Sequence, residues 1–303
     1  MKASFIIPTF KEFKQIEKLI SSFSFIKSDQ IEILIVNSNP KDITSQFIAD
    51  SSDKRFRELE GVSSLYWSGA VNIGLNFILN STNKPDYVFI MNADVEFNED
   101  ILEKFSQKAN GITKFQYAAV TVSGDNIVAS GARVKSWFFT SIIHPLAGSS
   151  KKDLDDDILI PVDYLPTRCV MFPYSALVEC GVIAEKSLPH YGGDEEFTNR
   201  LRIKGYQPYI YTGVSVYLDA SNTGTDVFQR PLNLNTRISS LFSIKSPSNP
   251  KYRTIFVKMV YPWYAIPTGI ILYILRSIME VFLGGRFINK ITKNNETGFS
   301  GLR

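Results

Sequence analysis

Apolar runs of strand length alternate with segments of helical spacing through the first 120 residues, and this alternation restricts the possible folds most. Residues 3–8 form a continuous apolar run, and residues 14–25 carry apolar side chains at helical spacing. Residues 31–36 and 87–91 repeat the strand pattern, residues 43–60 look mostly helical, and residues 68–80 look like an apolar helix. This order predicts an α/β fold with a doubly wound, mostly parallel sheet.

Polar residues follow the predicted strands where such sheets bind ligands, just outside the carboxyl ends. In segment 92–96, Asn92 and Asp94 are two residues apart, so their oxygens can face one site. A divalent cation that bridges a diphosphate needs only one or two protein carboxylates. The pattern therefore fits a metal site, although Asn and Asp are also common wherever a strand turns into a loop.

A second group of polar residues is the acidic start of a predicted helix over residues 194–204. Gly192 and Gly193 precede Asp194 and would let a ligand approach the backbone closely. A carboxylate held there could act as a general base on a hydroxyl group. Asp194 is equally suited to cap the helix, and the two roles are compatible.

Small residues open the predicted helix over residues 68–80, beginning with Ser68 and Gly69. Free N–H groups at a helix start can bind phosphate or sugar oxygens. Close packing of the helix on the sheet explains the small residues equally well.

The C-terminal segment is basic and apolar. Residues 251–303 contain eight Lys or Arg and two Glu, and the longest uncharged run, residues 259–275, has 17 residues and two prolines. A membrane span needs about 20 residues. We therefore expect a monotopic or re-entrant attachment to an anionic bilayer. The alternative is a helical pair packed on the catalytic domain or on a second subunit.

The two cysteines, Cys169 and Cys180, predict free thiols in a reducing compartment. The apolar run near the N-terminus is too short for a signal peptide, so we expect a cytoplasmic protein at the inner face of the membrane. The overall charge is only +3 and the basic residues concentrate in the tail. We predict no nucleic-acid partner.

Five segments, in their order along the chain, resemble the family-2 glycosyltransferases, an inverting group with the GT-A fold, and especially their rhamnosyltransferase-like branch. Residues 5–10 and 35–39 resemble the family's first two strands with their nucleotide loops, and residues 67–74 its Gly- and Asn-rich donor segment. Residues 92–94 resemble its metal-binding element. Residues 188–197 are the most specific match, and the likeness covers about residues 1–225.

The resemblance implies a role for each matching residue. Asp194 would be the catalytic base, and Asp94 a ligand of Mg²⁺ or Mn²⁺. Donor contacts are implied for Pro8, Thr9, Phe10, Glu12, Asn37, Trp67, Gly69, Asn72, Asn92, Ala93 and Arg168. Acceptor contacts are implied for His190, Tyr191, Gly192, Gly193 and Glu195.

Two positions depart from the family pattern. Asn37 occupies the place of an Asp that usually helps to recognise the base. Leu218 and Asp219 stand where many relatives have a His that joins the metal or diphosphate. Either Asp219 substitutes as a second metal ligand, or the metal site is weaker than usual.

The resemblance implies a metal-dependent inverting enzyme of polysaccharide or cell-wall synthesis. It would move a sugar from a UDP- or dTDP-sugar to a lipid-linked or cell-surface glycan. The GT-A domain would span residues 1–245, with a nucleotide-sugar part over about 1–120 and an acceptor part over 121–245. Residues 246–303 would form the membrane-associating helical extension, and a homo-oligomer stays open.

Two other classes of protein compete with this interpretation. A sugar-phosphate nucleotidyltransferase shares the strand–helix alternation but usually has a Gly-rich basic loop after its first strand, whereas residues 8–12 contain no glycine. The same absence argues against a dinucleotide-binding oxidoreductase. A membrane-tethered nucleotide-sugar or glycan binding protein with weak catalysis is the other alternative.

Overall fold

The computed structural model describes residues 1–128, 130–155, 157–218, 238–239 and 241–283. Contacts between residues divide the chain into two units, one of residues 1–135 and 142–223 and the other of residues 136–141 and 224–303. The predicted boundary at residue 245 falls inside the second of these units.

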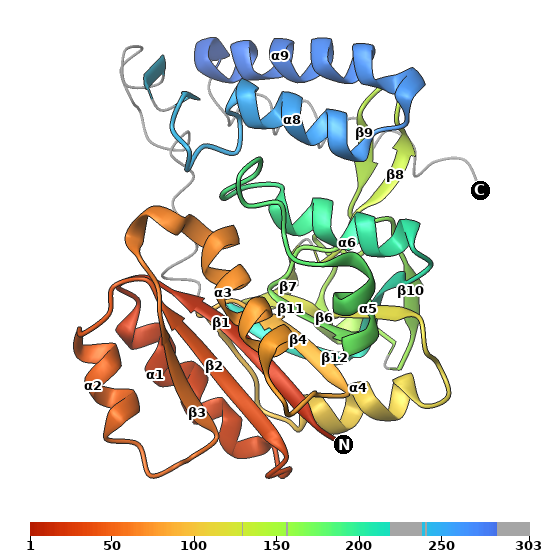
Figure 1. The fold of residues 1–303 in the computed structure, drawn as a ribbon. Coiled ribbons are helices and arrows are strands. Elements are labelled where there is room, and N and C mark those ends of the chain that lie inside the picture. The colour runs from red at the N-terminus through yellow and green to blue at the C-terminus, as the bar shows by residue number, and fades with distance from the viewer. Residues whose placement is uncertain (129, 156, 219–237, 240, 284–303) are drawn as a thin grey trace. The chain divides into compact units, whose positions relative to one another are not determined.

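The first unit is built on a mixed sheet with the strand order β10-β12-β6-β11-β4-β1-β2-β3 (Figure 1). Its strands are β1 (Ala3–Thr9), β2 (Ile31–Asn37), β3 (Phe56–Glu60), β4 (Tyr87–Met91), β5 (Val95–Glu96), β6 (Phe115–Ser123), β7 (Asn126–Ile127), β10 (Leu159–Pro161), β11 (Cys169–Pro173) and β12 (Gln207–Leu218). Its helices are α1 (Phe13–Ser22), α2 (Ile43–Ala49), α3 (Tyr66–Asn80), α4 (Ile101–Ala109), α5 (Tyr174–Cys180) and α6 (Gly193–Ile203). The hairpin β8 (Arg133–Ser136) and β9 (Ser141–Ile143) forms a separate two-stranded sheet.

One half of the sheet is parallel, as the alternating pattern predicts. Strands β4, β1, β2 and β3 run in the same direction. The rest of the sheet is mixed, so the prediction of a mostly parallel sheet is only partly correct there: β6 and β12 pair in parallel, whereas β11 lies antiparallel between β4 and β6. This insertion places the residue before β11, Arg168, at the carboxyl end of β4.

Helices cover both faces of the sheet, and each layer of helices has its own hydrophobic core. On one face, α1 and α4 pack against Phe5, Phe89 and their neighbours. On the other face, α3, α5 and α6 pack against Ile6, Val36 and Ile90. Burial on both faces explains why the central strands are continuous apolar runs.

The prediction that residues 43–60 are mostly helical is wrong in its second half. Helix α2 ends at Ala49, and residues 56–60 form the edge strand β3, which pairs with β2. The sequence Phe-Arg-Glu-Leu-Glu is partly exposed on both faces, so its charged residues hide the strand pattern.

The second unit contains α8 (Pro250–Val260) and α9 (Ile266–Leu283), joined by a short 3₁₀ turn over Trp263–Ala265. The hairpin tip belongs to this unit because the ring of Trp137 packs against Tyr261, with centroids 4.8 Å apart. Among the residues that the structure describes, we find no helix with the length and apolarity needed to cross a bilayer.

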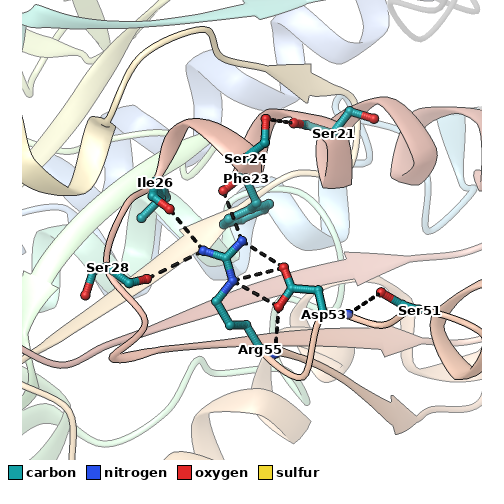
Figure 2. A network of polar contacts seen from close by, with 8 residues as sticks. All are labelled: Ser21, Phe23, Ser24, Ile26, Ser28, Ser51, Asp53 and Arg55. Carbon is teal, nitrogen blue, oxygen red and sulfur yellow. Dashed lines mark hydrogen bonds and ion pairs between the residues drawn. The ribbon is translucent and has the colours of Figure 1, made fainter.

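Arg55 joins the start of β3 to the segment that follows α1 (Figure 2). Its guanidinium group donates to both carboxylate oxygens of Asp53 and to the carbonyl oxygens of Phe23, Ile26 and Ser28. The hydrogen bonds from Arg55 hold the pKa of the Asp53 carboxyl below its ordinary value. One planar side chain thus ties the residue before β3 to the carbonyl groups of the segment between α1 and β2.

We expect Arg55→Lys to lower the free energy of unfolding by about 1–3 kcal/mol, because an ammonium group cannot make this forked set of bonds. Urea unfolding followed by circular dichroism measures the change. Arg57→Lys is the matched control, because Arg57 is 55% exposed and pairs with Glu32 at 3.5 Å, and its loss should stay below about 0.5 kcal/mol. Equal effects of the two substitutions would contradict the structural role of Arg55.

Candidate active site

Backbone hydrogen bonds continue past the carboxyl ends of β1, β2 and β3, so these strand ends lie side by side at one edge of the sheet. The N–H of Ser38 donates to the carbonyl of Thr9 at 2.9 Å, and the N–H of Gly61 donates to the carbonyl of Asn37 at 2.8 Å. Thr9 is buried, and its hydroxyl has no hydrogen-bond partner among the described residues. Pro8 and Thr9 are the last two residues of β1. The exposed ring of Phe10 comes next, and Glu12 lies in the loop that follows.

Asn37 is fully buried at this edge, and its amide group is held by the protein itself. The Nδ2 group donates to Asp42 Oδ1 at 3.0 Å and to Glu58 Oε1 at 2.9 Å, and Oδ1 accepts from the N–H of Asn39. An Asp at position 37 would bring a third carboxylate between two others. This explains the departure from the family pattern, and a direct contact of Asn37 with a donor stays a prediction.

The hydrogen bonds of this cluster also stabilise the charge of Asp42. Burial alone would raise the pKa of the Asp42 carboxyl, but hydrogen bonds from Asn39, Asn37 and the N–H groups of Ser45 and Thr44 outweigh it. The pKa is therefore held below its ordinary value, and the loop after β2 keeps an ionised carboxylate.

The loop after β4 brings Asn92, Trp67 and Arg168 together. The N–H of Asn92 donates to the carbonyl of Arg168 at 3.0 Å, and the indole Nε1 of Trp67 donates to Asn92 Oδ1 at 3.1 Å. Ala93 is buried between Asn92 and Asp94. The three predicted donor-binding residues therefore come from α3, the end of β4 and the start of β11, and they meet at one edge of the sheet.

Asp94 is suited to bind a cation. Its Oδ1 atom is buried and accepts no hydrogen bond from the part of the chain that the structure describes. Burial raises the pKa of the Asp94 carboxyl, and the positive charge of Arg168 only partly opposes this. A buried carboxylate oxygen without a donor fits a hard divalent cation such as Mg²⁺ or Mn²⁺. The predicted second ligand, Asp219, lies outside the described residues.

Asp194 lies in the first turn of α6, which begins one residue earlier than predicted. Gly192 is the N-cap with a φ of +81°, a backbone conformation that favours glycine, so Asp194 is not the cap. The N–H of Thr167 instead donates to Asp194 Oδ2 at 3.4 Å. This contact joins the start of α6 to the residue before Arg168.

The pKa of the Asp194 carboxyl is raised, chiefly because the protein crowds water away from it. Hydrogen bonds from the N–H groups of Glu195 and Thr167 and the charge of Arg168 lower it by less. Arg168 therefore acts electrostatically on both Asp94 and Asp194. The two predicted carboxylates, far apart in sequence, thus come within the electrostatic influence of one arginine.

The start of α3 supports the segment that carries Asp194. The hydroxyl of Ser68 donates to the carbonyl of Leu188 at 2.6 Å, and its N–H donates to the carbonyl of Pro189 at 3.0 Å. A Cβ on Gly193 would lie 2.5 Å from Ser68 Oγ, so only glycine fits there. Close packing of α3 on the sheet, which was the alternative explanation for its small residues, is present at Gly74, where a Cβ would lie 2.6 Å from Ile6 Cγ2.

Asn72 and Gly69 extend the same contact along α3. Asn72 is buried, and its amide donates to the carbonyl of Ile183 at 2.8 Å and to Glu185 Oε2 at 2.9 Å, while Oδ1 accepts from the N–H of Ile183. A Cβ on Gly69 would lie 2.9 Å from Leu65 Cβ. Asn72 thus uses its side chain to position the segment 183–193, and its predicted donor contact stays a prediction.

Aromatic rings lie beside the predicted acceptor residues. The ring of His190 lies 4.6 Å from that of the exposed Tyr191 and 6.3 Å from that of Tyr66. Tyr66 has a φ of +53°, a strained conformation for a tyrosine and one that is common near functional sites. Sequence patterns give no signal for Tyr66 or for Thr167. Tyr66 is distinguished by its positive φ and Thr167 by its backbone N–H, and a sequence pattern reports neither.

Comparisons with known proteins agree on the fold. Residues 4–149 match the family described as Glycosyl transferase family 2. A galactofuranosyl glycosyltransferase of Leishmania donovani is 26% identical over 187 residues, which are 54% of this chain and 43% of that protein. The chain thus spans less than half the length of this relative.

Solved structures with similar folds include S. aureus TarS 1–349, which is 16% identical with a TM-score of 0.52 over 90% of this chain and 89% of that one. The same segment of TarS has been solved with UDP, at 15% identity and a TM-score of 0.52. GalNAc-T7 with UDP, GalNAc and Mn²⁺ is 11% identical with a TM-score of 0.58, over 86% of this chain and 52% of that one. These likenesses confirm the predicted GT-A-like α/β fold.

The raised pKa of Asp194 makes a prediction about stability. The folded chain holds the proton of this carboxyl more tightly than the unfolded chain, so ionisation of Asp194 destabilises the fold as pH rises above about 3.8, its ordinary pKa, through the raised folded-state pKa. We expect Asp194→Asn to raise the thermal midpoint at pH 7.5, with a smaller gain at pH 4. Thermal unfolding at both pH values tests this, and a lower midpoint at pH 7.5 would contradict it.

Proposed function

We propose that the chain is an inverting glycosyltransferase that uses a nucleoside diphosphate sugar, because residues 4–149 match glycosyl transferase family 2. The observation that carries the proposal is that Asp94 and Asp194 both feel the charge of Arg168, the residue that precedes β11 beside the carboxyl end of β4. One carboxylate can serve the diphosphate and the other the acceptor, with one positive charge acting on both.

In the proposed reaction, an acceptor hydroxyl oxygen attacks the anomeric carbon from the face opposite the nucleoside diphosphate. Asp194 takes the hydroxyl proton as the new glycosidic bond forms and the bond to the diphosphate breaks. Crowding by the protein makes Asp194 a stronger base than an exposed aspartate. The charge of Arg168 favours the negative charge that develops on the leaving diphosphate.

A divalent cation fits the same arrangement. Bound to Asp94, Mg²⁺ or Mn²⁺ would supply positive charge to the leaving diphosphate. The buried and unpartnered Oδ1 of Asp94 supports this assignment within the described residues, and Asp219 is proposed as a second ligand from its position in the sequence.

A uridine nucleotide is the first donor to test. The TarS and GalNAc-T7 structures that share this fold are described with UDP, which supports a UDP-sugar, and a dTDP-sugar is the second choice. The Leishmania relative is a galactofuranosyl transferase, so UDP-galactofuranose belongs in the donor panel. The rhamnosyltransferase-like branch, and a lipid-linked or cell-surface glycan as acceptor, stay predictions from the sequence motifs.

Asp194→Asn should reduce transfer by about 10²–10⁴-fold, because the acceptor proton loses its base. Transfer of radiolabelled sugar measures the rate, and the thermal shift induced by UDP reports whether donor binding persists. Asp125→Asn is the matched control, because the Asp125 side chain is 81% exposed and its variant should keep full activity. Near-normal transfer by Asp194→Asn would rule out Asp194 as the base.

Excess EDTA should abolish transfer, and added Mn²⁺ or Mg²⁺ should restore it. Asp94→Asn should need a higher metal concentration for the same rate, because an amide oxygen binds a hard cation more weakly than a carboxylate. Initial rates over a metal titration test both statements. Full activity in EDTA would remove the metal from the proposed reaction.

A further inference from the structure

The outer face of α9 is apolar, whereas its inner face is small and polar. Ile271, Leu275, Ile278 and Phe282 are 57%, 50%, 46% and 66% exposed. A helix of a water-soluble domain normally turns such residues toward the core. We call this surface the outer face of α9.

The inner face of α9 packs on α8 through residues of the opposite kind. A Cβ on Gly269 would lie 3.0 Å from Val257 Cγ1, so the two helices are in close contact there. The hydroxyls of Tyr273 and Tyr261 lie 3.2 Å apart, and the hydroxyl of Ser277 donates to the carbonyl of Ser248 at 2.7 Å. These polar groups have hydrogen-bond partners. This side of α9 is therefore the one that packs on α8, and its apolar side faces outward.

Aromatic side chains enlarge the exposed apolar area of this unit. Trp263 is 83% exposed and Tyr264 is 54% exposed, and both lie in the turn between α8 and α9. Phe138 and Phe139, at the hairpin tip of the same unit, are 47% and 69% exposed. Trp and Tyr are typical of the boundary between a bilayer and water.

The charge of the unit indicates which partner the outer face of α9 meets. Residues 224–303 contain eleven Lys or Arg and only three Asp or Glu, and Lys258 and Arg276 lie exposed on α8 and α9. In a symmetric dimer through this face, two strongly positive units would meet. An anionic lipid surface attracts the same charge.

We propose that the outer face of α9 lies in the interfacial layer of an anionic bilayer, with α9 parallel to the membrane plane. Trp263 and Tyr264 enter the headgroup region, while the long side chains of Lys258 and Arg276 reach lipid phosphates. This placement does not depend on the proposed transfer reaction. It would hold the chain near substrates at a membrane surface.

Flotation of the full chain with lipid vesicles tests the proposal. We expect binding to mixed phosphatidylcholine and phosphatidylglycerol vesicles, with much weaker binding to pure phosphatidylcholine and at high salt. The variant Ile271→Gln/Leu275→Gln should bind about tenfold or more weakly, because it removes two apolar side chains from the bilayer without adding charge. Ile43→Gln is the matched control, since Ile43 is 58% exposed in the first unit, and it should bind like the wild type.

Two results would overturn the proposal. One is that the wild-type chain does not bind anionic vesicles. This result would overturn the proposal if the chain is a monomer, and also if analytical ultracentrifugation shows a dimer that Ile271→Gln/Leu275→Gln dissociates. The other is equal loss of vesicle binding in the α9 variant and in Ile43→Gln. Circular dichroism of each variant checks that its fold is intact, because all three side chains are exposed and their replacement should leave the spectrum unchanged.

Discussion

The candidate site depends on the close approach of the start of α3 to the segment that leads into α6. Ser68 and Asn72 are buried and give their side-chain hydrogen bonds to backbone groups of that segment, and Gly193 leaves no room for a side chain against Ser68. This contact holds the start of α6 in place, so that Asp194 can accept from the N–H of Thr167 beside Arg168. The contact therefore positions the segment that leads into α6, in whose first turn Asp194 lies.

The sequence predicts the parallel half of the sheet because its strands are buried on both faces. The runs that become β1, β2 and β4 are almost entirely apolar apart from Ser4, Glu32 and the polar residues that end β1 and β2, which is what two-sided burial demands. The edge strand β3 lacks this signal, since it is half exposed and carries charges. The antiparallel position of β11 between β4 and β6 is a long-range pairing that no local pattern encodes, yet it is what brings Arg168 to the site.

Motif matching locates the residues of the site better than it assigns their roles. Asp94 and Asp194 follow a strand end and begin a helix, and the fold brings both beside Arg168. Asn37 and Asn72 match donor-binding motifs, but their amide groups are occupied by neighbouring residues in the structure. Thr167 and Tyr66 carry no sequence signal. Thr167 contributes its backbone N–H to Asp194, and Tyr66 stands out by its positive φ, and neither property depends on the side chain. Backbone contributions of this kind become visible only once the fold is known.

The position of Asn37 between Asp42 and Glu58 has a consequence for how related sequences diverge. An amide can donate to both carboxylates, whereas a carboxylate at the same place would repel both inside a partly buried cluster. A relative that keeps the usual Asp at this position is therefore compatible with this loop only if the partner acids have been neutralised or have moved. We therefore expect substitutions at these three positions to occur together rather than singly.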